Sequence, residues 1–246
     1  MPLRARGESD QILVCFPAAA AGCSSFNQWR TDVDPSFGIW AVRLPGRESR
    51  FAEKPISSMA GIVQGLAAAI DELPPARLVF VGHCLGALVA YELTREMSRH
   101  GREDRMPTCL VTVGQPSPDT PVIVEKPIAD LSLAELIAML KEVGVTPSHL
   151  LDQERLMRAM AATIRADLQV GADYVDSGQQ PPLKIPIVAL RGDRDALASL
   201  HAVESWSRFT ADEFYLHTVR GGHGFFQERS EDVLSQLTHR LKAICG

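Results

Sequence analysis

Short apolar runs alternate along the chain with longer stretches in which apolar residues recur at helical spacing. The runs cover residues 12–16, 39–44, 78–81, 110–113, 185–190 and 214–219. Helical spacing is found between them at 62–73 and 88–97, and after the last run at 233–244. Buried strands joined by helical crossovers form a parallel sheet with helices on both faces. The alternation therefore predicts an α/β fold with a mostly parallel central sheet flanked by helices.

The alternation is interrupted once. From about residue 131 to 175 only helical patterns occur, which predicts a helical cap inserted between two strands of the sheet. A chain of 246 residues is long enough for one large domain and too short for two generous ones. We therefore expect a single domain over residues 1–246, with the cap insertion at about 131–175.

Composition narrows the classes of function. Hydrophobic residues make up 46% of the chain and charged residues 22%, which is typical of a globular protein and disfavours disorder and a membrane span. The net charge of -5 disfavours nucleic-acid binding driven by bulk attraction to phosphates. We expect a monomer with neither a nucleic-acid nor a membrane partner.

The cysteines indicate a reducing compartment. There are five of them, an odd number, without a CxxC pair or a repeating interval. This argues against a disulfide framework and against a structural zinc site, so we predict no metal and a cytoplasmic location. We assign no chemistry to four of the cysteines, which are Cys15, Cys23, Cys109 and Cys245.

The start of the chain faintly resembles a leader peptide. Arg4 precedes an apolar run over 12–21, but Asp10 and Pro17 interrupt the pattern. We expect this segment to form the first core strand and a turn of the active site instead.

The turn Gly82-His83-Cys84-Leu85-Gly86 lies between a buried strand and a helix, the context in which G-x-S-x-G forms a nucleophile elbow. The two glycines avoid collisions in the tight turn, and the central side chain projects from strained backbone. The N-terminus of the following helix favours a thiolate. No G-x-S-x-G occurs in the chain, so Cys84 is the candidate nucleophile. The alternative is an inert cysteine buried at the end of a strand.

A cysteine nucleophile needs a carboxylate and a histidine, in that order along the chain. The run 185–190 leads into Arg191-Gly192-Asp193-Arg194-Asp195, where α/β enzymes place catalytic side chains. We predict Asp195 as the carboxylate, with Asp193 as the alternative because a carboxylate beside a glycine can cap the turn. The run 214–219 leads into Gly221-Gly222-His223-Gly224, whose glycines allow His223 to project as the base.

Two backbone N–H groups are expected to bind the oxyanion of an acyl-transfer reaction, one after the nucleophile and one from an early turn. Leu85 supplies the first. The turn after the first apolar run supplies the second, from Ala19. A turn of small residues that only packs under the site would have the same pattern.

Together these motifs resemble the type II thioesterases, stand-alone α/β-hydrolases that accompany polyketide synthases and nonribosomal peptide synthetases. The resemblance covers nearly the whole chain and is carried by Phe16-Pro17-Ala18-Ala19, Leu44-Pro45-Gly46-Arg47, Gly82-His83-Cys84-Leu85-Gly86, Arg165-Ala166-Asp167 with Tyr174, Gly192-Asp193-Arg194-Asp195, Trp206, and Gly221-Gly222-His223. The chain departs from the family pattern at Ala20-Ala21, where members usually have two glycines. It departs again at Cys84, where most members have serine.

The resemblance implies hydrolysis of acyl groups from the phosphopantetheine arms of carrier proteins, without a cofactor, through an acyl-enzyme on Cys84. Attack of a thiolate on a thioester forms another thioester, so the acyl group stays activated. An acyltransferase or aminoacyltransferase that shuttles acyl groups between carrier proteins is therefore the alternative. Dienelactone hydrolases also have G-x-C-x-G, although the L-P-G-R segment and the helical cap fit them poorly. A binding protein without catalytic activity is disfavoured by the intact set of Cys84, Asp195 and His223.

Overall fold

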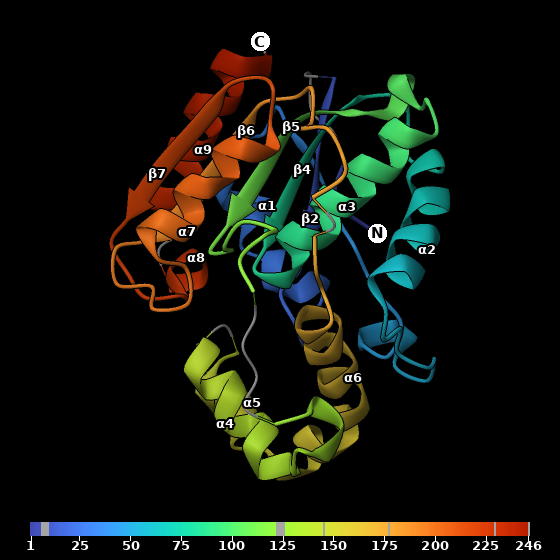
Figure 1. Ribbon diagram of the computed structural model, residues 1–246, viewed down its shortest axis with the longest axis vertical. Helices are drawn as coiled ribbons and strands as arrows, with labels where there is room; N and C mark the ends of the chain where they lie inside the picture. The colour runs from blue at the N-terminus through green and yellow to red at the C-terminus, as the bar shows by residue number, and fades with distance from the viewer. Residues whose placement is uncertain (6–9, 122–125, 145, 177, 229, 246) are drawn as a thin grey trace.

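The computed structural model describes residues 1–5, 10–121, 126–144, 146–176, 178–228 and 230–245. In these ranges seven strands form one sheet in the order β1-β3-β2-β4-β5-β6-β7. Figure 1 labels β2, β4, β5, β6 and β7. The strands are β1 (Pro2–Arg4), β2 (Gln11–Phe16), β3 (Gly38–Ala41), β4 (Arg77–His83), β5 (Pro107–Val113), β6 (Ile187–Gly192) and β7 (Phe214–Val219). Only the pairing of β1 with β3 is antiparallel. The predicted, mostly parallel sheet is confirmed.

Helices cover both faces of the sheet. They are α1 (Trp29–Asp32), α2 (Met59–Asp71), α3 (Leu85–Arg99), α4 (Leu133–Val143), α5 (Ser148–Leu151), α6 (Glu154–Ala172), α7 (Leu200–Glu204), α8 (Phe225–Glu228) and α9 (Ser230–Cys245). In β2, Ile12 and Val14 pack toward α2 and α3, whereas Leu13 and Cys15 pack toward α1 and α9. Strands buried on both faces explain the uninterrupted apolar runs of the sequence. No helix in the described ranges combines the length and apolarity needed to cross a bilayer.

Several strands differ from the predicted runs by two or three residues at an end, among them β3, β4, β5 and β6, and one strand was not predicted. The run 39–44 leaves the ladder after Ala41, and the run 185–190 enters it at Ile187 and continues to Gly192. Strand β1 has only 3 residues, too few for a periodic pattern. Its position is secured by the Arg4 guanidinium, which donates hydrogen bonds to four distant backbone carbonyls, those of Arg30, Val33, Asp34 and Phe37.

Helices α4, α5 and α6 form a separate group beyond the end of the sheet at which β4 runs into α3 (Figure 1). Helix α4 begins at a capping box between Ser132 and Glu135 and ends at Gly144, whose φ of 70° is left-handed. The group has an apolar cluster of its own around Leu136 and Ile164. The described residues of 131–175, which omit residue 145, contain helices and turns and no strand.

Candidate active site

Cys84 lies at the turn between β4 and α3, with φ 51° and ψ -126°. A side chain at Gly82 would place its Cβ 2.3 Å from Ala87 Cα, and one at Gly86 would place its Cβ 2.2 Å from the Phe16 carbonyl oxygen. Such distances exclude every residue except glycine. A left-handed, non-glycine residue costs about 1–3 kcal/mol and persists only where its neighbours impose it. The glycines therefore allow the close approach that exposes Cys84 at the turn.

The other cysteines are placed differently. Cys15, Cys23 and Cys109 are buried, whereas Cys84 is partly exposed. Burial raises the pKa of the Cys15 and Cys23 thiols, which disfavours their reactive thiolate form. The side chain of Cys245 lies outside the described residues.

His223 and Asp195 form a buried pair. His223 Nδ1 lies 2.8 Å from Asp195 Oδ2, and the two side chains are 5% and 0% exposed. The second carboxylate oxygen, Oδ1, accepts hydrogen bonds from the backbone N–H groups of Leu197 and Ala198, both at 3.0 Å. The carboxylate is thus held on both sides, and its orientation determines that of the imidazole.

The contacts between these side chains shift the pKa values of His223 and Asp195. Burial alone lowers the pKa of His223, but the hydrogen bond to Asp195 and the interaction with Cys84 outweigh it and raise the pKa to about 10. Burial opposes ionisation of Asp195, yet the hydrogen bond to His223 holds its pKa below the usual range. His223 Nε2 is buried and has no nitrogen or oxygen partner among the described residues.

Asp193, the alternative carboxylate, has a different role in the structure. Its Oδ1 accepts a hydrogen bond from the Gly221 backbone N–H at 2.9 Å, and its side chain is 45% exposed. Asp193 therefore connects two loops. This agrees with the alternative role for a carboxylate beside Gly192, which was to cap the turn. Of the two carboxylates, Asp195 is the one that is hydrogen-bonded to His223.

The ring of His223 rests on a second histidine. His83 stacks against it with centroids 6.0 Å apart and an angle of 29° between the planes, and Phe226 packs on His83 at 4.7 Å. Burial lowers the pKa of His83 to about 3, with the charge of His223 acting in the same direction. His83 is therefore neutral and stacks against the charged ring of His223. The elbow pattern in the sequence did not predict this contact.

The turn after β2 lies beside the elbow. The Ala19 N–H donates no hydrogen bond within the described residues, and Leu85 is the first residue of α3, so its N–H has no acceptor within the helix. Ala19, Cys84 and Leu85 line one cavity. Ala20 is left-handed with φ 60°.

A buried ion pair holds this turn. Asp167 of α6 accepts hydrogen bonds from both terminal nitrogens of Arg47, each at 2.8 Å, and from the Ala20 N–H at 2.7 Å. Arg47 also donates to the Ala21 carbonyl at 2.9 Å. The two charged side chains are 3% and 2% exposed. Sequence reasoning missed this contact, because Arg47 and Asp167 lie 120 residues apart and no spacing links them.

The cavity beside Cys84 has a volume of about 430 Å³ and is also lined by His223. Its apolar walls come from α3, α4 and α6, through Leu85, Leu88, Met139, Leu140 and Leu168. Walls of this kind suit an apolar group bound next to a nucleophile.

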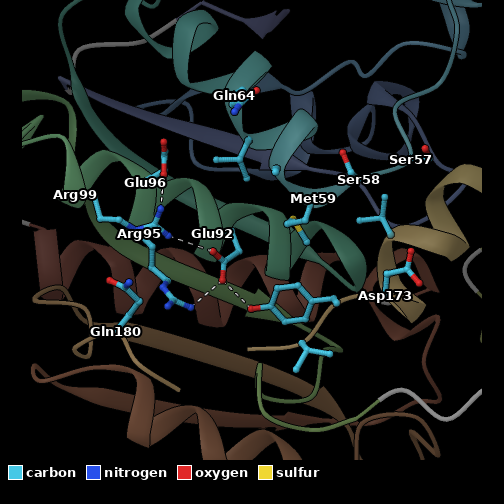
Figure 2. Close-up of a pocket in the computed structure, with 15 residues that line it drawn as sticks. Ser57, Ser58, Met59, Gln64, Glu92, Arg95, Glu96, Arg99, Asp173 and Gln180 are labelled. Carbon is cyan, nitrogen blue, oxygen red and sulfur yellow. Dashed lines mark hydrogen bonds and ion pairs between the residues drawn. The ribbon is translucent and has the colours of Figure 1, made fainter. Parts of the chain in front are cut away.

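A second cavity, of about 610 Å³, lies between α2, α3 and the end of α6 (Figure 2). Neither Cys84 nor His223 lines it. Its charged side chains on α3 pair with one another, as Arg95 does with Glu92 at 2.9 Å. The smaller cavity is therefore the candidate active site. Among the described residues, no group of three or more histidine, cysteine, aspartate and glutamate side chains is arranged to hold a metal ion.

Comparison with known proteins identifies relatives over most of the chain. The family model of the thioesterase domain matches residues 11–241. Thioesterase PikA5 of Streptomyces venezuelae is 29% identical over 95% of this chain and 82% of its own. The gramicidin S biosynthesis protein GrsT of Aneurinibacillus migulanus is 28% identical over 94% of this chain and 89% of its own.

A solved structure agrees with these relatives. The type II thioesterase BorB from the borrelidin biosynthetic cluster superimposes with a TM-score of 0.87 at 26% identity, over 98% of this chain and 96% of that one. The α/β-hydrolase fold expected from the sequence is confirmed.

The first testable consequence concerns the charge of His223. Its raised pKa means that protonation of His223 stabilises the fold fully below the ordinary value of 6.5, and that this contribution is lost as the pH rises through about 10. At pH 8 we expect an imidazolium. Asp195→Asn removes the partner charge, so burial then lowers the pKa of His223. Asp193→Asn leaves the pKa of His223 unchanged. NMR of ¹⁵N-labelled histidine measures the pKa of His223 in the wild type and in both variants. A neutral His223 at pH 8 in the wild type, or equal effects of the two substitutions on this pKa, contradicts this account.

Proposed function

Because the chain belongs to the thioesterase domain family, we propose that it is a type II thioesterase that hydrolyses acyl thioesters of phosphopantetheine on carrier proteins. Relatives named for borrelidin and gramicidin S biosynthesis support a polyketide or nonribosomal peptide pathway. The observation that carries the proposal is the position of Cys84 at a strained elbow, where it lines the same cavity as His223. Nδ1 of His223 is in turn hydrogen-bonded to Asp195.

In the first step, the Cys84 thiolate attacks the carbonyl carbon of the acyl thioester. The carbonyl oxygen becomes an oxyanion, which the N–H groups of Ala19 and Leu85 stabilise. The bond to the pantetheine sulfur then breaks, and that sulfur takes the proton that His223 holds. The products are a free pantetheine thiol and an acyl group bound to Cys84 as a thioester.

In the second step, His223 Nε2 accepts a proton from water as the oxygen attacks the acyl-enzyme. The carbon–sulfur bond to Cys84 breaks, which releases the carboxylic acid and leaves a thiolate beside an imidazolium. Asp195 does not change its own protonation; it keeps Nδ1–H oriented and stabilises the charge that returns to the ring. The cycle uses water and no cofactor.

The helices of residues 131–175 serve as a cap over this reaction. Apolar side chains of α4 and α6 form one wall of the cavity that contains Cys84. A carrier protein cannot enter a space of about 430 Å³, so only its acyl-pantetheine arm reaches Cys84. The cap therefore covers the acyl chain while the carrier remains outside.

Transfer of the acyl group to a second carrier is the alternative outcome, and the sulfur of Cys84 favours it. The acyl-enzyme is a thioester, so its acyl group remains activated toward another thiol. An oxygen ester on serine reacts far less readily with thiols.

Two substitutions of Cys84 test the proposal. The enzyme is incubated with an acyl-loaded carrier and a second, empty carrier, and both are followed by intact mass. We expect the wild type to release free acid and Cys84→Ala to release none above background, because the nucleophile is gone. We expect Cys84→Ser to lower the ratio of transferred to hydrolysed acyl groups.

Two outcomes of this experiment would contradict the proposal. Undiminished hydrolysis by Cys84→Ala would refute the assignment of the nucleophile. A ratio in Cys84→Ser that stays the same or rises would show that sulfur does not determine the acceptor. The ratio is compared rather than the rate, because the serine variant can be slower in both reactions.

A further substitution tests the turn that carries Ala19. Arg47→Lys keeps the charge but loses the two-pronged contact with Asp167, so the turn is less well oriented. We expect kcat to fall about 10- to 100-fold with little change in KM, because the contact to the oxyanion is made mainly in the transition state.

Arg158→Lys on α6, where the arginine side chain is 70% exposed, is the matched control and leaves kcat unchanged. Full activity of a folded Arg47→Lys variant, with folding checked by urea unfolding, contradicts this role.

A further inference from the structure

Gly171, in the last turn of α6, lines the cavity beside Cys84. A Cβ added to it would have one neighbour within 4 Å among the described residues, Leu85 Cδ1 at 3.9 Å. That distance is an ordinary van der Waals contact, and the φ of Gly171 is not left-handed. Neither packing nor backbone conformation therefore requires glycine at this position.

The other glycines of the site are different. Gly86 is required because a Cβ there would lie 2.2 Å from a backbone oxygen. In a helix, glycine is less favourable than alanine because it loses more conformational freedom on folding. Gly171 reduces the stability of α6 without relieving a collision. What its missing side chain provides is empty space, and that space is part of the cavity.

The end of α6 is anchored, so this space cannot close by movement of the helix against α3. The Tyr174 hydroxyl donates to Glu92 Oε1 at 2.8 Å, and Arg95 donates to the same oxygen at 2.9 Å and to Asp176 Oδ1 at 2.6 Å. Figure 2 shows Glu92 and Arg95 side by side on α3. The Arg95 and Asp176 side chains are 6% and 7% exposed, so water screens their ion pair little.

We propose that Gly171 determines the size of the acyl group that the site accepts, an inference that rests on the proposed thioesterase function. Leu85 directly follows Cys84, so a side chain at position 171 would fill space next to an acyl group bound to the nucleophile. The nearby walls, from Leu88 and Leu168, are apolar. The substrate class is therefore a hydrocarbon acyl chain longer than acetyl, and part of that chain occupies the space that Gly171 leaves.

The test compares acetyl, butyryl and octanoyl thioesters of pantetheine as substrates for the wild type, Gly171→Ala and Gly171→Leu. We expect the ratio of kcat/KM for octanoyl to that for acetyl to fall in both variants, and at least about tenfold in Gly171→Leu. Exclusion of a single methylene from an apolar pocket already changes kcat/KM by about tenfold or more. The melting temperature of Gly171→Ala is expected to be no lower than that of the wild type, which excludes a folding defect.

Gly65 of α2 provides the matched control. It is also helical, a Cβ on it would have no neighbour within 4 Å, and it lines a different cavity from that of Cys84. Gly65→Ala and Gly65→Leu should leave the ratio unchanged. Equal losses for acetyl and octanoyl in Gly171→Leu, or the same change of ratio in Gly65→Leu, would overturn the inference. A wild type that hydrolyses neither these three thioesters nor an acyl-loaded carrier protein would overturn the proposed function itself, which distinguishes the two failures.

Discussion

The close approach of the first turn of α3 to the end of β2 is the constraint on which the site depends. It is possible only because Gly86 has no side chain, since a Cβ there would lie 2.2 Å from the Phe16 carbonyl oxygen. The same approach brings the turn that contains Ala19 beside the start of the helix. Cys84 consequently lies on strained backbone and lines the same cavity as Ala19 and Leu85. The parallel sheet then brings the loops after β6 and β7, which carry Asp195 and His223, to the same end.

The second constraint is the buried ion pair of Arg47 and Asp167. A buried pair is weak evidence for stability, because desolvation of the charges opposes their attraction. This pair also accepts the Ala20 N–H and donates to the Ala21 carbonyl, so it specifies the conformation of the turn. Alanine at φ 60° is strained, and glycine at that position would not be. The strained conformation of Ala20 is thus held by its hydrogen bond to Asp167 of α6.

Local patterns account for what could be predicted from the sequence. Buried strands, the elbow glycines and the glycine-flanked His223 each follow from a few consecutive residues, and the resemblance to thioesterases that they carry is confirmed. Contacts between distant segments could not be predicted in this way. Strand β1 depends on hydrogen bonds from Arg4 to carbonyls 26 to 33 residues away. The sequence favours Asp195 and leaves Asp193 as the alternative, and it is the contact of Asp195 with His223, 28 residues away, that separates the two. The open space at Gly171 depends on where α6 ends against α3.

The central claim is that Cys84 forms the acyl-enzyme, and one measurement addresses it most directly. The enzyme is mixed with an acyl-loaded carrier protein, the reaction is stopped with acid during turnover, and the digested protein is mapped by mass spectrometry. The account predicts the mass of the acyl group on the peptide that contains Cys84 and on no peptide that contains Cys15, Cys23 or Cys109. Acylation of another residue, or rapid hydrolysis with no covalent acyl-enzyme at any time point, would contradict it.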